Sequence, residues 1–237
     1  MNALAYANHA IPLPARVAKH AVFGLLPGQI GLRNRACFHH LTKPRAELQF
    51  NAALTTVRPG DLCIDCGANR GDYTKRFAHA GADTYAFEPD PWSFAELTRR
   101  AGRLRGTHLI NKAVGTATGT LPFFRDADFE DAPEWCSLGS SIFCRTDRPQ
   151  EEIKVEIVDF LAFLRGLDRT IRILKMDIEG AEVPILETLF ASDLMERIDY
   201  LFVETHELQF PELLERTWAL RARRHSFPGT AINLDWH

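Results

Sequence analysis

The sequence predicts an α/β protein with a doubly wound, mostly parallel sheet and helices on both faces. From residue 60 onward, short apolar segments alternate with amphipathic segments of helical length, and this order is typical of β-α-β units. The short segments are apolar throughout and do not alternate strictly between apolar and polar residues. Strands that helices cover on both faces have this composition.

The predicted elements follow in chain order. Strands are expected at 61–66, 83–88, 107–114, 171–176, 198–203 and, near the end of the chain, 230–236. Helices are expected at 72–80, 91–101, 159–165, 180–191 and 211–224. Pro91 suits the first turn of its helix, whereas Gly81 and Gly102 suit helix ends.

Residues 115–158 interrupt this alternation. They contain an acidic cluster between 126 and 134 and candidate strands at 120–124, 140–144 and 153–158. We expect an insertion or hairpin beside the third strand. The resulting division is an N-terminal basic arm or cap over 1–50, with helical character, and a domain over 51–237 that includes the insertion.

Charge is unevenly distributed along the chain. Its 237 residues have a formal net charge of −3, so that nucleic acid is not an expected partner. Residues 1–50 hold six basic side chains and a single acidic one, Glu47, which leaves a net charge of −8 on the rest. A basic arm on an acidic body either meets an anionic partner or packs on the body.

Neither a membrane span nor a secretory leader is expected. No segment reaches the roughly 18 apolar residues that a spanning helix needs, and the first basic residue, Arg16, comes too late for a signal peptide. The apolar segment 21–32 either makes weak contact with a membrane surface or packs as a helix on the domain.

The cysteines favour a reduced, cytoplasmic compartment. There are five of them, an odd number, and no leader is expected. Cys63 and Cys66 form a CxxC pair inside an apolar segment that we predict to be a strand. A redox pair needs a helix N-terminus to lower the thiol pKa, so a structural role is the better interpretation.

The segment after the first predicted strand is typical of a loop that binds a nucleoside-bearing cofactor. Gly67 and Gly71 let the backbone turn sharply into a helix and let a ligand approach, and Asn69 tolerates positive φ. Glu88, at the end of the second strand, follows Gly67 by 21 positions. A carboxylate there can accept hydrogen bonds from both hydroxyls of a ribose.

Asp65 suggests which cofactor this is. On the rim of the loop its carboxylate would repel phosphate, because like charges 4 Å apart cost on the order of 4 kcal/mol at an intermediate effective dielectric constant. The same carboxylate would favour a ligand with an ammonium and a sulfonium group, and S-adenosylmethionine has both. A turn or N-cap role for Asp65 is the alternative.

Ionisable side chains follow the fourth predicted strand. Lys175, Asp177 and Glu179 share one face of an extended segment, and burying them unpaired would be costly. They are therefore candidates for catalysis. The alternative is an ion pair of Lys175 with a carboxylate, together with helix capping by Glu179 and Glu182.

The fifth predicted strand ends in a second polar group. Glu204 and His206 share a face there, next to Asp177. His206 is placed to remove a hydroxyl proton near neutral pH. Asp177, Glu204 and His206 are alternatively candidates for holding a divalent metal, and their spacing does not separate the two uses.

Six segments can be compared with known motifs. They are CIDCGANRGDYT (63–74), YAFEPDPWSF (85–94), NKAVG (111–115), SLGSSIF (137–143), ILKMDIEGAE (173–182) and FVETH (202–206). Together they resemble the FkbM-type S-adenosylmethionine-dependent methyltransferases. The resemblance implies a seven-stranded, Rossmann-like methyltransferase domain and methyl transfer to a hydroxyl oxygen. The implied acceptor is a sugar, glycolipid or polyketide-like natural product.

The resemblance also implies site residues. The cofactor would meet Asp65, Gly67, Ala68, Asn69, Gly71, Tyr73, Glu88, Pro89, Ala113, Val114, Ser141 and Asp177, with Ser140 beside the adenine. We expect in-line displacement, with the acceptor hydroxyl held on the sulfonium–methyl axis. His206, supported by Glu204 or Asp177, would take the proton.

Three other functions stay open. An RNA methyltransferase would use the arginines at 99, 100, 103, 105, 221, 223 and 224. A nucleotide-dependent oxidoreductase would bind NAD(P), which Asp65 disfavours. A catalytically silent module would bind the cofactor without turnover. The acceptor's identity and the oligomeric state cannot be read from this sequence.

Overall fold

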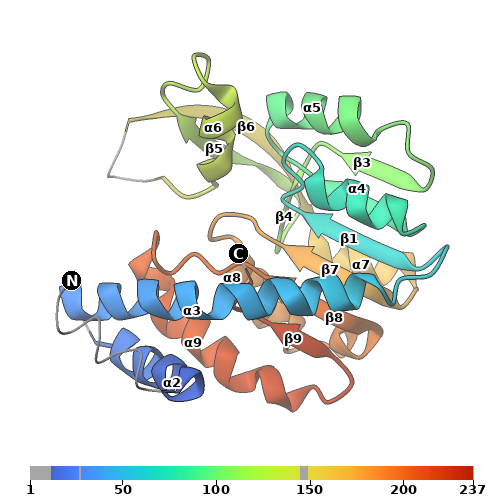
Figure 1. The fold of residues 1–237 in the computed structure, drawn as a ribbon. Coiled ribbons are helices and arrows are strands. Elements are labelled where there is room, and N and C mark those ends of the chain that lie inside the picture. Colours follow the sequence, from blue (N-terminus) through green and yellow to red (C-terminus); the bar gives the residue numbers. More distant parts are fainter. Residues whose placement is uncertain (1–11, 27, 145–148, 237) are drawn as a thin grey trace.

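The computed structural model describes residues 12–26, 28–144 and 149–236. Its main sheet has six strands in the order β3-β2-β1-β7-β8-β9 (Figure 1). All neighbouring strands are parallel, which confirms the predicted fold class. The strands are β1 (Leu62–Cys66), β2 (Asp83–Phe87), β3 (Thr107–Ile110), β7 (Ile171–Met176), β8 (Ile198–Val203) and β9 (Ala231–Asn233).

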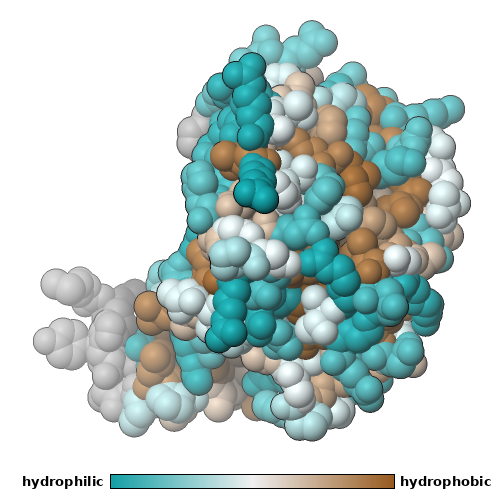
Figure 2. All heavy atoms as spheres, turned by 90° about the vertical axis from the view of Figure 1, so that its right-hand side faces the viewer, coloured by the Kyte–Doolittle hydropathy of each residue, from teal (hydrophilic) through white to brown (hydrophobic). Residues whose placement is uncertain are grey.

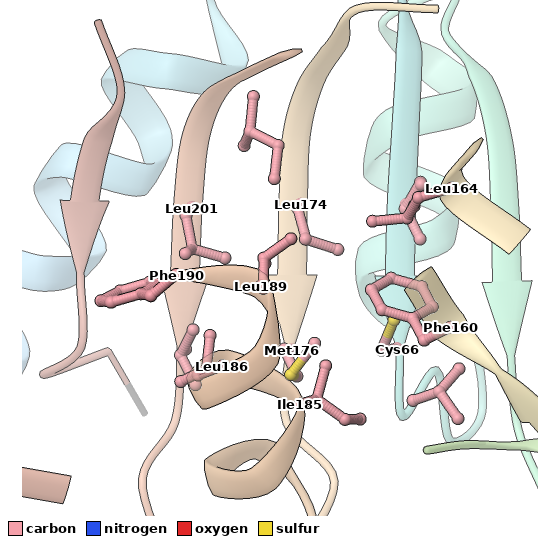
Figure 3. Packing of buried hydrophobic residues seen from close by; sticks show 14 of the residues in the cluster. Cys66, Phe160, Leu164, Leu174, Met176, Ile185, Leu186, Leu189, Phe190 and Leu201 are labelled. Carbon is pink, nitrogen blue, oxygen red and sulfur yellow. The ribbon is translucent and has the colours of Figure 1, made fainter. Parts of the chain in front are cut away.

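Helices cover both faces of this sheet. Side chains alternate along a strand, so that Ile64 of β1 faces one side and Cys63 the other. Ile64 packs with residues of α7 (Phe160–Leu167) and α8 (Glu182–Leu189), as Figure 3 shows for this layer. Cys63 packs with residues of α3 (Gly28–Leu54) and α4 (Asp72–His79).

Three further helices complete the layers. On the side of Cys63, α5 (Pro91–Ala101) packs on Ala86 of β2. On the side of Ile64, α9 (Leu214–Arg223) follows the 3-10 turn η3 (Pro211–Leu213) and contributes Leu220 to the core. The N-terminal helix α2 (Leu13–Gly24) packs against α3, and two short 3-10 turns, η2 (Asp193–Arg197) and η4 (Arg224–Ser226), flank strands and helices of this domain.

A second sheet of three strands forms the insertion. Its order is β4-β6-β5, with β4 (Ala113–Gly115), β5 (Gly119–Asp126) and β6 (Gln150–Asp159). The single strand predicted over 107–114 is in fact two, because the chain leaves the main sheet after β3 and enters the small sheet at β4. Between β5 and β6 lie the short α6 (Pro133–Cys136) and η1 (Ser137–Gly139).

The strand predicted at 140–144 is wrong. The structure has a single bridge there, between Phe124 and Ser141. The Ser141 hydroxyl accepts a hydrogen bond from the Phe143 N–H and donates one to the Glu179 carbonyl. Such side chain to backbone bonds compete with strand pairing. The described residues also place six strands in the main sheet, one fewer than the family resemblance implies.

The outer surface is mixed in polarity. Figure 2 shows the face on the right-hand side of Figure 1, where hydrophilic side chains alternate with smaller hydrophobic areas. Over the described residues, no helix has both the length and the apolar character needed to cross a membrane.

Candidate functional site

A cavity of about 430 Å³ lies at the carboxyl ends of the central strands. In a doubly wound sheet, ligands bind at this edge, where the strand order reverses, here between β1 and β7. The volume is within the range of about 300–1,000 Å³ that small-molecule sites occupy. The predicted site residues that line it are Gly67, Asn69, Glu88, Pro89, Ala113, Val114, Ser140, Asp177, Glu179 and Glu204.

The loop after β1 is fixed by its backbone. Gly67 has a φ of +76°, and a Cβ there would lie 1.7 Å from the Asp177 carbonyl oxygen, so only glycine fits. Asn69 also has a positive φ, 46°. Its N–H donates to Glu88 Oε2 at 2.7 Å. This bond fixes the loop after β1 beside the carboxylate that follows β2.

Glu88 is buried at the wall of the cavity. Its second oxygen, Oε1, accepts from the Asp90 N–H at 2.9 Å. Burial, with a smaller effect of the Asp90 charge, raises the pKa of Glu88 to about 8, although the two backbone N–H groups act in the opposite direction. Each carboxylate oxygen has two acceptor sites, so both retain capacity for a ligand hydroxyl.

The structure does not place Asp65 on the rim of the loop. Alternation along β1 turns it toward the face that α3 and α4 cover, where it is fully buried. Its Oδ1 lies 3.2 Å from Lys175 Nζ, and its Oδ2 accepts from the Thr74 hydroxyl at 2.6 Å. This carboxylate is compensated inside the protein, so its charge cannot select between phosphate and sulfonium ligands.

Lys175 is the counter-ion of Asp65. Burial opposes its charge, but the carboxylates of Asp65 and Asp177 keep the pKa of Lys175 above its ordinary value. Its Nζ donates to the Gly67 carbonyl at 2.7 Å and lies 5.5 Å from the ring centre of Tyr73. The alternative interpretation of Lys175, an ion pair with a carboxylate, is therefore the one that the structure supports.

Two residues at the end of β8 join the residues after β7. His206 Nε2 lies 3.7 Å from Asp177 Oδ1, 3.5 Å from Glu179 Oε2 and 4.0 Å from Glu204 Oε1. The structure thus brings together the four groups that the sequence placed after two neighbouring strands. Glu179 reaches this group through a turn with a φ of 54°, not in an extended segment as predicted.

His206 is enclosed by carboxylates. It is 3% exposed, and its Nδ1 lies 3.1 Å from Glu182 Oε1, which also accepts from the His206 N–H. Burial opposes protonation, but Glu182, Glu179 and Asp177 raise the pKa of His206 well above its usual value. A protonated imidazole has no lone pair for a proton, so this geometry does not support the predicted role of His206 as the base.

Glu204 combines two properties within this group: it faces the cavity, and its pKa is strongly shifted. Its side chain is 28% exposed and lines the cavity. Burial, together with the charges of Asp177 and Glu179, raises the pKa of Glu204 to about 8, and His206 acts in the opposite direction. A carboxyl group with such a pKa can accept a proton from a ligand near neutral to mildly alkaline pH.

The chemistry of this group also suits a cation. One ligand atom each of Asp177, Glu179 and His206 lies within 4.8 Å of the others, as a metal site requires. Glu204, which the sequence included in the metal set, is not in this group. Glu182 beside Nδ1 would orient His206 for a metal at Nε2. With a proton on Nε2, the imidazolium itself is the counter-charge of these carboxylates.

The other predicted cofactor residues lie behind the cavity wall. Ala68 packs against α5, and a Cβ on Gly71 would meet Leu97 at 2.6 Å. Tyr73 packs edge-on against Phe50 and Trp236 on the face that α3 covers. Ser141 is buried and donates to the Glu179 carbonyl at 2.5 Å, so it fixes the turn that presents Glu179.

Sequence reasoning missed one contributor and left the role of another open. Lys43 of α3 lines the cavity, although residues 1–50 were expected to form an arm outside the domain. A helical pattern continuing through residue 50 would have indicated it. For Glu182 the sequence left helix capping and a functional role as alternatives, and the structure buries its side chain fully against His206.

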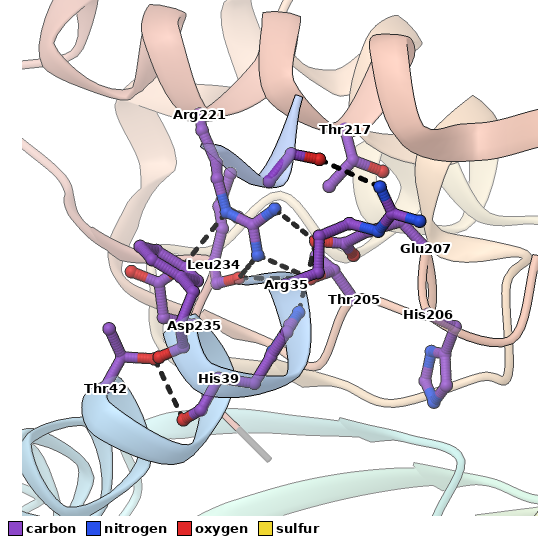
Figure 4. A network of polar contacts seen from close by, with 12 residues as sticks. Arg35, His39, Thr42, Thr205, His206, Glu207, Thr217, Arg221, Leu234 and Asp235 are labelled. Carbon is purple, nitrogen blue, oxygen red and sulfur yellow. Dashed lines mark hydrogen bonds and ion pairs between the residues drawn. The ribbon is translucent and has the colours of Figure 1, made fainter. Parts of the chain in front are cut away.

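A buried polar network supports the loop after β8 (Figure 4). Arg221 of α9 donates to Glu207 Oε1 at 2.6 Å and to the Thr205 hydroxyl at 2.8 Å. His39 of α3 lies 3.2 Å from the same Glu207 oxygen. Thr205 and Glu207 flank His206, so that α3 and α9 together hold the segment that carries His206.

The cysteines take no part in this site. Cys63 and Cys66 are buried free thiols in β1. Burial raises the pKa of Cys63 to about 12 and that of Cys66 well above its ordinary value. Neither forms thiolate near neutral pH, in agreement with the structural role that we predicted.

Comparison with known proteins gives one family and several distant relatives. The family model of the methyltransferase FkbM domain matches residues 65–225. The chain is 26% identical over 190 residues to the 2-O-methyltransferase NoeI of Sinorhizobium fredii, covering 72% of this chain and 76% of that protein. It is 27% identical over 213 residues to the 31-O-demethyl-FK506 methyltransferase FkbM of Streptomyces tacrolimicus, covering 75% and 81%.

A third relative is more distant. The hexuronic acid methyltransferase AglP of Haloferax volcanii is 22% identical over 154 residues, which cover 65% of this chain and 59% of that protein. No solved structure gives a significant match.

Proposed function

Because the chain belongs to the FkbM methyltransferase family, whose model matches well over half of it, we propose that it transfers a methyl group from S-adenosylmethionine to a hydroxyl group of a sugar or natural product. The names of the relatives support this acceptor class, since they refer to 2-O-methylation, a 31-O-demethyl natural product and hexuronic acid.

The Asn69–Glu88 contact is the observation that carries the cofactor assignment. It places a buried carboxylate with free acceptor capacity at the cavity wall, beside the loop after β1. Two ribose hydroxyls can donate to the remaining lone pairs of Glu88. When bound, S-adenosylmethionine supplies an electrophilic methyl group on a positively charged sulfur.

Charge selection is reassigned from Asp65 to other carboxylates. Lys175 compensates Asp65, whereas Asp177, Glu179 and Glu204 line the cavity and share His206 as a nearby cation. Even with Glu204 protonated, the carboxylates of Asp177, Glu179 and Glu182 beside one imidazolium leave an excess of negative charge. That excess favours a ligand with an ammonium and a sulfonium group over a diphosphate.

Glu204 is the proposed proton acceptor. It lines the cavity beside Asp177, and its pKa of about 8 lies close enough to neutrality for general-base catalysis. His206 is a positioning residue in this proposal, because it is buried and directs both ring nitrogens at carboxylates. The chain would hold the acceptor hydroxyl in line for attack, which supplies a large share of the acceleration.

Calorimetry with S-adenosylmethionine tests the cofactor assignment. Glu88→Ala should weaken binding by about 1–3 kcal/mol, because bound hydroxyls would lose their acceptor. Glu96→Ala, which removes a carboxylate on the outer side of α5 next to Arg99, is the matched control and should bind like the wild type. Equal affinity in both variants, or tighter binding of NAD(P) than of S-adenosylmethionine, would refute the proposal.

A further inference from the structure

Exposed large apolar side chains gather at one place on the N-terminal helical pair. α2 ends at Gly24 and α3 begins at Gly28. Around this junction lie five such residues, which we name the apolar tip: Val22, Phe23, Leu25, Leu26 and Ile30, with exposed fractions of 64%, 46%, 54%, 41% and 61%. Within the described part of the chain, just two other large apolar side chains are similarly exposed, Leu13 and Leu48.

The apolar tip is held in place by buried contacts. Gly31 packs so closely against the end of the tip that a Cβ there would lie 1.6 Å from the Leu26 carbonyl oxygen. Arg35 donates to the Gly24 carbonyl at 2.8 Å, and His20 Nδ1 lies 2.7 Å from Asn34 Oδ1. α2 and α3 are therefore locked together, and the tip side chains point outward from a rigid support.

The charge around the tip is positive. The first 46 residues of the chain contain no acidic side chain. Arg33 is exposed and follows Ile30 by three positions, so that the two share a face of α3. Exposed Lys43 and Arg45 lie further along the same helix. The rest of the molecule, by contrast, is acidic.

We propose that the apolar tip docks on an anionic lipid bilayer. Its apolar side chains would enter the boundary between headgroups and acyl chains, while Arg33 and the neighbouring cations contact lipid phosphates. Charge argues for this occupant over a second copy of the chain. Two identical tips facing each other would bring together the cations of two helical pairs that contain no acidic side chain up to residue 46.

Docking in this way would bring the cavity toward the membrane. In Figure 1 the carboxyl ends of β1 and β7 point to the side of the molecule where α2 and the beginning of α3 lie. Lys43 of the same α3 lines the cavity. The cavity could then reach a methyl acceptor that is carried at the membrane surface. This consequence rests on the proposed function, whereas the docking itself does not.

Vesicle co-sedimentation tests the docking. The full chain should bind vesicles of phosphatidylcholine with about 30% phosphatidylglycerol, and bind phosphatidylcholine alone far more weakly. Replacing both Phe23 and Ile30 with Asp should weaken binding at least about tenfold. Arg33→Glu should weaken it about fivefold and reduce its salt dependence. Leu48→Asp is the matched control, because Leu48 is 70% exposed on α3 outside the tip, and it should bind like the wild type.

Three results would overturn the docking. The first is no preference of the wild type for anionic vesicles, and the second is equal loss in the Leu48 control. The third is a dimer in gel filtration that the Phe23→Asp, Ile30→Asp variant converts to a monomer, which would place a second copy on the tip. The tip variant should unfold at the wild-type temperature and bind S-adenosylmethionine with wild-type affinity. Its weaker vesicle binding then reflects the loss of docking and not of folding.

Discussion

Carboxylates at the carboxyl ends of β1, β7 and β8 differ in how their charge is compensated. Asp65 is fully buried with Lys175 at 3.2 Å, while Asp177 lies farther from the same lysine, at 3.6 Å. Asp177, Glu179 and Glu204 instead surround one imidazole. Only the second group leaves charge for a ligand in the cavity. Asp65 and Asp177 thus carry the same charge near the ends of neighbouring strands but have different roles. The reason is that the side chain of Asp65 points to the sheet face that helices cover, whereas the side chain of Asp177 lines the cavity.

The pKa of Glu204 predicts the pH dependence of turnover. Burial and neighbouring carboxylates raise it to about 8, so the basic form increases as pH rises through that value. Methyl transfer should therefore increase about tenfold between pH 7 and pH 9. Glu204→Gln should lower turnover by roughly 10²–10⁴-fold and abolish the increase. Transfer of a deuterated methyl group into host glycans and metabolites, followed by mass spectrometry, measures both.

Chelation distinguishes this mechanism from a metal-assisted one. Both ring nitrogens of His206 face carboxylate oxygens, an arrangement that an imidazolium satisfies. We therefore expect unchanged turnover in EDTA. Loss of turnover that added Mg²⁺ or Mn²⁺ restores would contradict this and favour Asp177, Glu179 and His206 as ligands.

The sequence could predict which residues line the cavity where their place after a strand is sufficient to bring them there. Gly67, Asn69, Glu88, Asp177 and Glu204 all line the cavity, because each follows a parallel strand at the same edge. Asp65 could not be placed in this way. Its position one residue before the end of β1 turns its side chain to the opposite face, and the lysine that compensates it lies more than 100 residues further along the chain.

At the scale of elements, α3, α9 and the loop after β8 meet in one buried network. Glu207 is fully buried between His39 of α3 and Arg221 of α9. Arg221 also donates to Asp235 at 3.0 Å and to the Leu234 carbonyl at 3.0 Å. The network thus joins α3, α9 and residues 234 and 235 around the segment that carries His206.

This network predicts acid sensitivity. Burial opposes the charge of Glu207, but Arg221 and His39 lower its pKa well below the usual range. A depressed carboxyl pKa contributes its full stability above the unfolded pKa, about 4.3, and that stability is lost progressively as pH falls from there through the lower folded pKa. Glu207→Gln should lower the free energy of unfolding by about 3–5 kcal/mol at pH 7, and by less near pH 3, where part of this stability is already lost.

Urea unfolding at the two pH values measures this difference. Glu187→Gln is the control, since Glu187 pairs with Arg216 on the surface at 2.6 Å. An exposed pair contributes at most about 1 kcal/mol. An equal loss at pH 7 and pH 3 in the Glu207 variant would contradict the proposed role of the ion pairs.

The helices and strands of the main sheet were predictable because hydrophobic periodicity determines them locally. β1, β2, β7 and β8 all lie within a residue of the predicted ranges. The insertion was less predictable. Its predicted strand at 140–144 is replaced by contacts such as that between the Ser141 hydroxyl and the Glu179 carbonyl, 38 positions away, which no local pattern contains.

At the scale of the whole molecule, α3 connects the N-terminal residues to the sheet. It runs without interruption from Gly28 to Leu54, through Pro44 and through residue 50, where the sequence suggested the start of a separate domain. The basic composition of residues 1–50 favoured an arm in the sequence. Phe50 nevertheless packs at 0% exposure against Phe77, Phe202 and Trp236.

Truncation tests how far the N-terminal residues belong to the folded unit. A fragment of 51–237 loses Ala46 and Phe50 from the core on the α3 face of the sheet. It also loses His39 beside Glu207. Removing one buried aromatic side chain alone costs about 3–5 kcal/mol, a large part of the 5–15 kcal/mol that stabilises a typical domain. We expect this fragment to show no cooperative unfolding by circular dichroism.

A fragment that begins at Gly28 is the matched control. It lacks α2 but keeps all of α3, so Phe50 and His39 retain their partners. Cooperative unfolding and S-adenosylmethionine binding should persist in it, while binding to anionic vesicles should decrease because Val22, Phe23, Leu25 and Leu26 are gone. Cooperative unfolding of 51–237 at the wild-type temperature would instead establish a domain border at residue 50 and make α3 an appended cap.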